Sequence, residues 1–113
     1  NPFALEQQIE GGVVMAMGAA LTEEMLIDKA TGLPLNGNLL DYKPLSIKDA
    51  PLADVILVEH PKEYGVFGAH GIGEPPMALP APAIANAIYN ALGVWITEPP
   101  FTREKIQAAL KGA

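Results

Sequence analysis

Apolar residues recur at every fourth position near the start of the chain and predict a helix over 3–22. The ridge consists of Leu5, Ile9, Val13, Met17 and Leu21. Asn1 is placed to cap this helix, because its side chain can accept a hydrogen bond from a backbone N–H in the first turn. Pro2 fits the first helical position, where no backbone hydrogen bond is lost. We expect the ridge to face the core.

The opposite face of this helix carries small residues. Gly11, Gly12 and Gly18 lie there together with Gln8 and Met15. A glycine inside a helix costs roughly 0.5–1 kcal/mol relative to alanine, so several on one face need a reason. We therefore expect another group to approach the helix backbone closely on this side.

Short apolar runs bounded by turn residues predict strands in the middle of the chain. The clearest is 53–59, which is rich in β-branched residues and is expected to be buried on both faces at its centre. The runs at 24–28 and 33–35 suggest a hairpin with an irregular loop. Shorter strands are expected at 39–42 and 94–97.

Two further helices are expected in the last third of the chain. Residues 83–92 place their apolar side chains on one helical face, and Gly93 follows where it can end the helix. Thr102 is a suitable cap for an amphipathic helix that continues to Leu110. The predicted fold is therefore α+β: a long N-terminal helix, short mixed strands, a glycine-rich loop into a second helix, and a C-terminal helix. We expect a single segment, 1–113, that forms part of a larger domain.

Composition narrows the function classes. The 113 residues are 50% hydrophobic and 18% charged, with a net charge of -6. This composition is too apolar for disorder, and its apolar runs are too short to span a membrane. Because acids outnumber bases, no basic patch is available to bind nucleic acid.

Other counts point to a larger assembly. The chain has no cysteine, which excludes thiol catalysis, disulfides and thiolate metal ligands from it. With 11 Gly, 11 Pro and few charges, it is expected to bury much of its surface against a larger partner. We expect a cytoplasmic protein.

The glycine-rich segment 64–76 holds the strongest candidate for chemistry. Glu74 is the only acid in this run, and Pro75 is expected to hold it out of the helical region. Gly71 and Gly73 would let the backbone approach a ligand or adopt a positive φ. A carboxylate fixed in this way can serve as a general base.

The residues alone also permit other interpretations. Glu74 fits equally an acid near a helix N-terminus, stabilised by the helix dipole. The glycine run fits a backbone anion site, although it lacks the Lys-Ser/Thr ending of a phosphate-binding loop. His60 and His70 have no second imidazole at ligand spacing, so we expect no metal site built within this chain.

Four blocks, in order, resemble the molybdenum-binding subunit of the xanthine dehydrogenase and aldehyde oxidoreductase family. They are 8–24 (QIEGGVVMAMGAALTEE), 40–43 (LDYK), 68–76 (GAHGIGEPP) and 83–88 (AIANAI). The Gly-x-Gly-Glu-Pro-Pro block is the most specific, and the resemblance covers essentially the whole chain. It implies that the chain is the C-terminal segment of a much larger molybdopterin-binding subunit.

The resemblance also implies a reaction and a site. Family members hydroxylate a carbon of an N-heterocycle or an aldehyde with oxygen from water, and the glutamate that matches Glu74 acts as base beside the molybdenum without ligating it. The implied cofactor-binding residues are Gly11, Gly12, Met15, Gly71, Ile72 and Gly73. Many members carry Gln at the position of Met15, and that Gln contacts the oxo ligand. In this chain the contact is lost or is supplied elsewhere.

The same resemblance implies the cofactors and partners. The cofactor would be molybdenum with molybdopterin, either as such or as its cytosine dinucleotide. Iron-sulfur centres and FAD would lie on partner domains or subunits and carry the electrons away from a small-molecule substrate. The alternative is a non-catalytic interaction or anion-binding module with the same fold. In either case we expect the chain alone to be catalytically inert.

Overall fold

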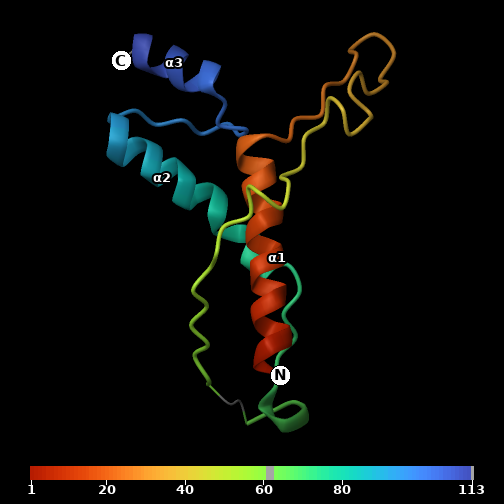
Figure 1. Ribbon diagram of the computed structural model, residues 1–113, viewed down its shortest axis with the longest axis vertical. Coiled ribbons are helices and arrows are strands. Elements are labelled where there is room, and N and C mark those ends of the chain that lie inside the picture. Colours follow the sequence, from red (N-terminus) through yellow and green to blue (C-terminus); the bar gives the residue numbers. More distant parts are fainter. Residues whose placement is uncertain (61–62, 113) are drawn as a thin grey trace.

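The computed structural model describes residues 1–60 and 63–112 (Figure 1). Within these ranges the order of elements is α1 (Pro2–Leu21), η1 (Val66–Gly68), η2 (Pro75–Ala78), α2 (Pro80–Leu92) and α3 (Arg103–Lys111). η1 and η2 are short 3₁₀ turns in the glycine-rich segment. α1 is the long central element, and both η2 and α2 pack against it.

The predicted N-terminal helix is confirmed, and so is its cap. The Asn1 side chain accepts a hydrogen bond from the backbone N–H of Ala4 at 3.3 Å, and Pro2 begins the helix. The expected ridge is only half-buried, however. The buried residues of α1 are its small ones, Gly12, Ala16, Gly18 and Ala20. Close packing on this helix therefore depends on backbone proximity more than on large side chains.

α2 and α3 also agree with the sequence. α2 begins at Pro80 instead of 83, because prolines are tolerated in a first turn whose N–H groups have no partner. Gly93 ends it in the left-handed conformation, with φ 72°. Thr102 caps α3 by accepting from the backbone N–H of Lys105 at 3.3 Å.

The hydrophobic core lies where the C-terminal end of α1 meets α2 and α3. Ala20, Ile96 and Phe101 form its buried centre, and the backbone N–H of Phe101 donates to the Ala20 carbonyl at 2.7 Å. Partly buried apolar residues surround this centre: Leu21, Ala81, Ile84, Ala85, Ile88, Ile106 and Ala109. This cluster joins the C-terminal end of α1 to the last third of the chain.

The predicted strands are not found. In the described ranges the only β pairing is an isolated antiparallel bridge between Ile27 and Pro34, inside the expected hairpin. Residues 53–59 form no strand, 39–42 form a turn, and 94–97 stay irregular. A strand requires a hydrogen-bonding partner from elsewhere in the sequence, and the described residues supply none here. The α+β class is therefore not supported, because the described chain is mostly helical.

The chain is unusually open for its size. Its accessible surface is 8832 Å², whereas a compact monomer of this mass exposes about 5,900 Å². Its radius of gyration is 17.8 Å, against about 13 Å for a compact domain of this length. Among the described residues, no helix is both long and apolar enough to cross a bilayer. The fold thus leaves much apolar surface uncovered.

Candidate functional site

The glycine-rich loop turns back at the N-terminal end of α1 and then returns along that helix (Figure 1). Gly65 and Gly68 adopt positive φ values of 90° and 67°, and Phe67 between them has φ 56°. Positive φ is rare for a side chain as bulky as phenylalanine. The sharp bending therefore occurs at 65–68, before the Gly-x-Gly-Glu-Pro-Pro block.

Glu74 lies at the start of η2 with an exposed side chain. Its backbone has φ -93° and ψ -5°, so the prediction that Pro75 would hold it out of the helical region is wrong. The reason is the turn itself. The Glu74 carbonyl accepts from the backbone N–H of Met77 at 2.8 Å, which offsets the steric preference of a residue before proline.

Two contacts hold the Glu74 turn against α1. The side-chain amide of Gln8 donates to the Gly73 carbonyl at 2.8 Å. One helical turn further on, Gly12 is buried under Pro76, and a Cβ added to Gly12 would lie only 2.7 Å from the Pro76 Cβ. The backbone on both sides of Glu74 is therefore fixed to one face of the helix.

Gly12 needs no external ligand to explain its lack of a side chain. The close approach expected at the small-residue face is made here by Pro76, a residue of the same chain. The assignment of Gly12 to the cofactor stays a prediction. The contact with Pro76 is enough to explain why position 12 is a glycine.

Three other predicted site residues have no such internal explanation. A Cβ built on Gly11, Gly71 or Gly73 would meet nothing within 4 Å in the described part of the chain. Gly71 and Gly73 do not adopt positive φ either, so of the two expected reasons for glycine here, the conformational one does not apply. Neither packing nor conformation within this chain requires glycine at these positions. Their open backbone fits the close approach of a group from outside it.

Met15 shares the side of α1 on which the Glu74 turn is held. Gln8, Gly12 and Met15 are spaced at i, i+4 and i+7, which places them along one face of a helix. Met15 is 56% exposed. The structure thus brings Gly73, Glu74, Gly12 and Met15 to the same flank of α1, with Gly11 beside them.

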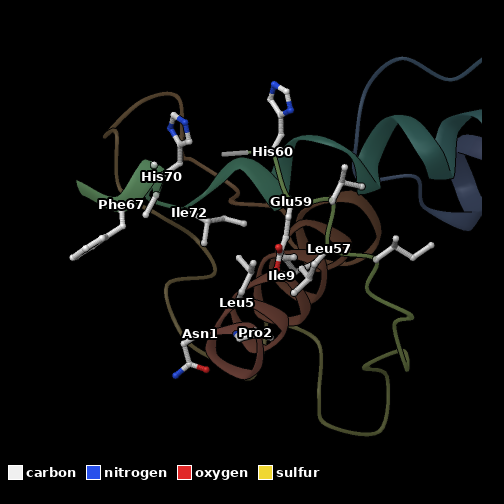
Figure 2. A pocket seen from close by; sticks show the side chains of 14 residues that line it. Asn1, Pro2, Leu5, Ile9, Leu57, Glu59, His60, Phe67, His70 and Ile72 are labelled. Carbon is white, nitrogen blue, oxygen red and sulfur yellow. The ribbon is translucent and has the colours of Figure 1, made fainter. Parts of the chain in front are cut away.

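A large cavity lies nearby but is a separate feature (Figure 2). It has a volume of about 580 Å³ and lies between the N-terminal half of α1, residues 56–60 and residues 67–72. Of the predicted site residues, only Ile72 lines it, and Glu74 does not. In Figure 2, Leu5 and Ile72 point toward each other, while the rings of His60 and Phe67 point away.

The histidines do not form a metal centre in the described ranges. No group of three or more His, Cys, Asp or Glu side chains gathers there in a way that could hold an ion. The His70 ring packs edge-on against Tyr64, with centroids 6.3 Å apart. Any metal at this site must therefore arrive within a cofactor or be held by ligands from outside the described residues.

Sequence reasoning missed the role of Gln8. The residue was placed on the small-residue face, but nothing in the pattern linked it to a carbonyl 65 positions away. The same holds for the contact between Gly12 and Pro76. These two contacts form because η2 packs on α1, and no local pattern in the sequence predicts that packing.

The chain is similar to known proteins over almost its whole length. Residues 1–51 match the family of molybdopterin cofactor-binding domains. The putative xanthine dehydrogenase molybdenum-binding subunit of Escherichia coli strain K12 is 41% identical over 94% of this chain. The aldehyde oxidoreductase of Megalodesulfovibrio gigas is 37% identical over 98% of the chain. The crystal structure of quinoline 2-oxidoreductase from Pseudomonas putida 86 covers 98% of the chain at 31% identity, with a TM-score of 0.88.

The chain belongs to the xanthine dehydrogenase and aldehyde oxidoreductase family of molybdenum-binding proteins. Within that family it corresponds to one part of the molybdenum-binding subunit. The chain spans 14% of the length of the Escherichia coli relative, 12% of the Megalodesulfovibrio gigas protein and 14% of the quinoline 2-oxidoreductase chain. Residues beyond the described chain therefore make up most of each relative.

Proposed function

We propose that the chain forms part of a molybdenum-dependent oxidoreductase that hydroxylates a carbon of an N-heterocycle or an aldehyde. In this role it supplies the catalytic base, Glu74, and part of the molybdopterin pocket. The observation that carries the proposal is the position of Glu74 on a turn fixed to α1 by Gln8 and by Pro76. This turn adjoins backbone that nothing in the described chain covers.

The pocket would be lined from two elements. Gly11 and Met15 contribute from α1, and the main chain of Gly71, Ile72 and Gly73 contributes from the loop. The open Cβ positions at Gly11, Gly71 and Gly73 support this assignment, since a bulky group can contact their backbone directly. Gly12 would contribute by letting η2, and with it Glu74, lie close to α1.

A molybdenum cofactor held by these residues would supply the redox chemistry of a hydroxylation that uses oxygen from water. Glu74 would take a proton during this step, and its exposed carboxylate is free to do so because it makes no hydrogen bond among the described residues. Gln8 would act through the backbone, because its amide fixes the Gly73 carbonyl that directly precedes Glu74. Two electrons would leave through iron-sulfur and flavin groups on partner domains or subunits.

The decisive experiment replaces Glu74 in the assembled enzyme. Glu74→Gln keeps the size of the side chain but removes its basicity. We expect turnover to be lost while molybdenum content, measured by elemental analysis, stays unchanged. Glu98→Gln, at another exposed glutamate, is the matched control and should leave turnover intact. Retained turnover in Glu74→Gln would contradict the assignment.

The same preparation tests the alternative of a non-catalytic module. If the chain purifies in its native assembly without molybdenum and without a neighbouring oxidoreductase subunit, the loop is a binding element and no reaction takes place there. If molybdenum co-purifies with the assembly, that alternative is rejected.

A further inference from the structure

Residues 50–60 form an extended segment with strongly exposed apolar side chains. Leu52, Ile56 and Val58 are 103%, 85% and 86% exposed. A monomeric protein rarely presents several large aliphatic side chains side by side to water. This segment therefore resembles part of a protein interior that has not been covered.

Exposure along the segment follows a period of two. Val55 and Leu57 are half-buried, whereas Asp54, Ile56 and Val58 are exposed. Alternation of this kind is characteristic of a β-strand, in which successive side chains point to opposite faces. All of 56–60 lines the large cavity, but of these residues only Leu57 is half-buried, and Figure 2 shows its side chain beside α1, so the inner face lies toward that helix.

The backbone of the segment has no partner in the described ranges. No residue of 50–60 takes part in a backbone–backbone hydrogen bond, and none takes part in a side-chain hydrogen bond with another described residue. Water can satisfy these groups while the segment is exposed. Once Ile56 and Val58 are covered, however, the N–H and C=O groups must find protein partners or cost several kcal/mol.

A second β-strand is the element that can satisfy the open backbone N–H and C=O groups of this segment. It can pair with a row of alternating N–H and C=O groups, which a helix surface cannot do. Side chains of the paired strand would flank Ile56 and Val58 on the outer face, which a further layer packed on the sheet would cover, while α1 lies on the inner face. The spacing and chemistry of the segment therefore specify the type of partner.

We propose that residues 53–59 pair with a β-strand from the remainder of the molybdenum-binding subunit. The chain spans only 14% of the Escherichia coli relative, so ample sequence is available to supply that strand. A second copy of this chain is disfavoured as partner, because it carries the same net charge of -6 and repeats the acids Asp54 and Glu59 within the segment. The sheet thus begins in this chain and is completed outside it.

Amide hydrogen exchange on the complete molybdenum-binding subunit tests this pairing. We expect amides within 53–59 to exchange at least about 100-fold more slowly than those of the exposed turn at 29–31, which serves as an internal reference. Exchange as fast as the reference would overturn the proposal. Protection that appears only after other subunits are added, or only at high protein concentration, would also overturn it, because the partner would then be another subunit or a second copy.

Proline substitution provides an independent test. Neighbouring strand residues direct their N–H groups to opposite edges, so Leu57→Pro and Val58→Pro together probe both edges. At least one of them should abolish the slow exchange of 53–59. Val58→Thr keeps both the N–H group and the branched side chain, and should preserve slow exchange. If both proline variants keep native protection, the pairing is refuted. None of these measurements uses turnover, so this result and the role of Glu74 are decided separately.

Discussion

The two ends of α1 have very different surroundings. At its C-terminal end, Ala20 packs with Ile96 and Phe101, and α2 and α3 close around them. At its N-terminal end, the helix faces an extended segment and a loop in which Ile56, Val58 and Phe67 are almost fully exposed. One end is stabilised by contacts within the chain. The other end offers surfaces that only further protein or a cofactor can cover.

The residues that stabilise the fold and the residues proposed for catalysis therefore lie in different halves of the chain. The proposed base and its loop lie toward the open half, where the contacts of Gln8 and Gly12 help to hold them against the helix. The packed half contains no candidate catalytic group. A chain with this division can keep a fixed fold at one end while the other end adapts to its partners. Four predictions test the comparison.

The largest effect is expected in the packed half. Phe101 is 6% exposed and Phe67 is 99% exposed. Phe101→Ala should lower the free energy of unfolding by about 3–5 kcal/mol, because it leaves a cavity beside Ala20. In the chain without its partners, Phe67→Ala should change stability little. Thermal unfolding followed by circular dichroism compares the two. Equal losses of unfolding free energy in the two variants would show that the two ends of α1 do not differ in packing.

The next effect concerns the junction of the two halves. Gly12→Ala would place a methyl group 2.7 Å from the Pro76 Cβ, and such overpacking costs about 1–3 kcal/mol. Gly11→Ala meets nothing within 4 Å, and should stabilise the chain without cofactor by about 0.5–1 kcal/mol. In the assembled enzyme the same Gly11→Ala change should reduce molybdenum content. Full molybdenum content would argue against a cofactor at this position.

A smaller effect is expected for the anchor of the Glu74 turn. Gln8→Ala removes the 2.8 Å hydrogen bond to the Gly73 carbonyl. A hydrogen bond of this kind contributes about 1 kcal/mol, so kcat should fall by about fivefold at unchanged molybdenum content. Gln7→Ala alters an exposed neighbour with no hydrogen bond among the described side chains, and kcat should stay the same. If both variants behave alike, Gln8 does not position the base.

The smallest effect concerns a turn in the open half that is held by local bonds alone. The Ser46 hydroxyl donates to the Asp49 carboxylate at 2.6 Å, and the Ser46 backbone N–H donates to it at 3.0 Å. These bonds lower the pKa of Asp49, the hydroxyl being the larger cause. The stabilisation is therefore complete above the ordinary aspartate pKa and is lost as pH falls through the lowered value. Ser46→Ala should raise the pKa of Asp49, as measured by carboxyl NMR titration. An unchanged titration would show that the hydroxyl bond does not form in solution.

The elements that sequence reasoning predicted correctly are those with local signals. Asn1 and Thr102 cap their helices, and Gly93 ends α2 with φ 72°. Each of these signals acts within a few residues, so the pattern along the chain contains the necessary information. The three helices follow from them.

The predictions of the strands and of the Glu74 backbone failed for different reasons. A strand at 53–59 needs a partner that the described chain does not contain, so a correct preference for extended backbone gave no sheet. The backbone of Glu74 depends on a local turn, closed by the hydrogen bond from the Met77 N–H, which offsets the usual preference of a residue before proline. Recognition of Glu74 came from the Gly-x-Gly-Glu-Pro-Pro block and not from its conformation. The strand depends on a distant partner, whereas the Glu74 backbone depends on which of two local preferences is stronger.

The exposed row of Leu52, Ile56 and Val58 also has a consequence for biosynthesis. Until the segments that cover it have folded, this extended segment exposes apolar side chains and unpaired backbone groups. Such an exposed strand edge promotes aggregation. Cells producing this polypeptide should therefore need a chaperone, or simultaneous synthesis of what covers that edge. Overproduction of the chain by itself should direct part of it into inclusion bodies.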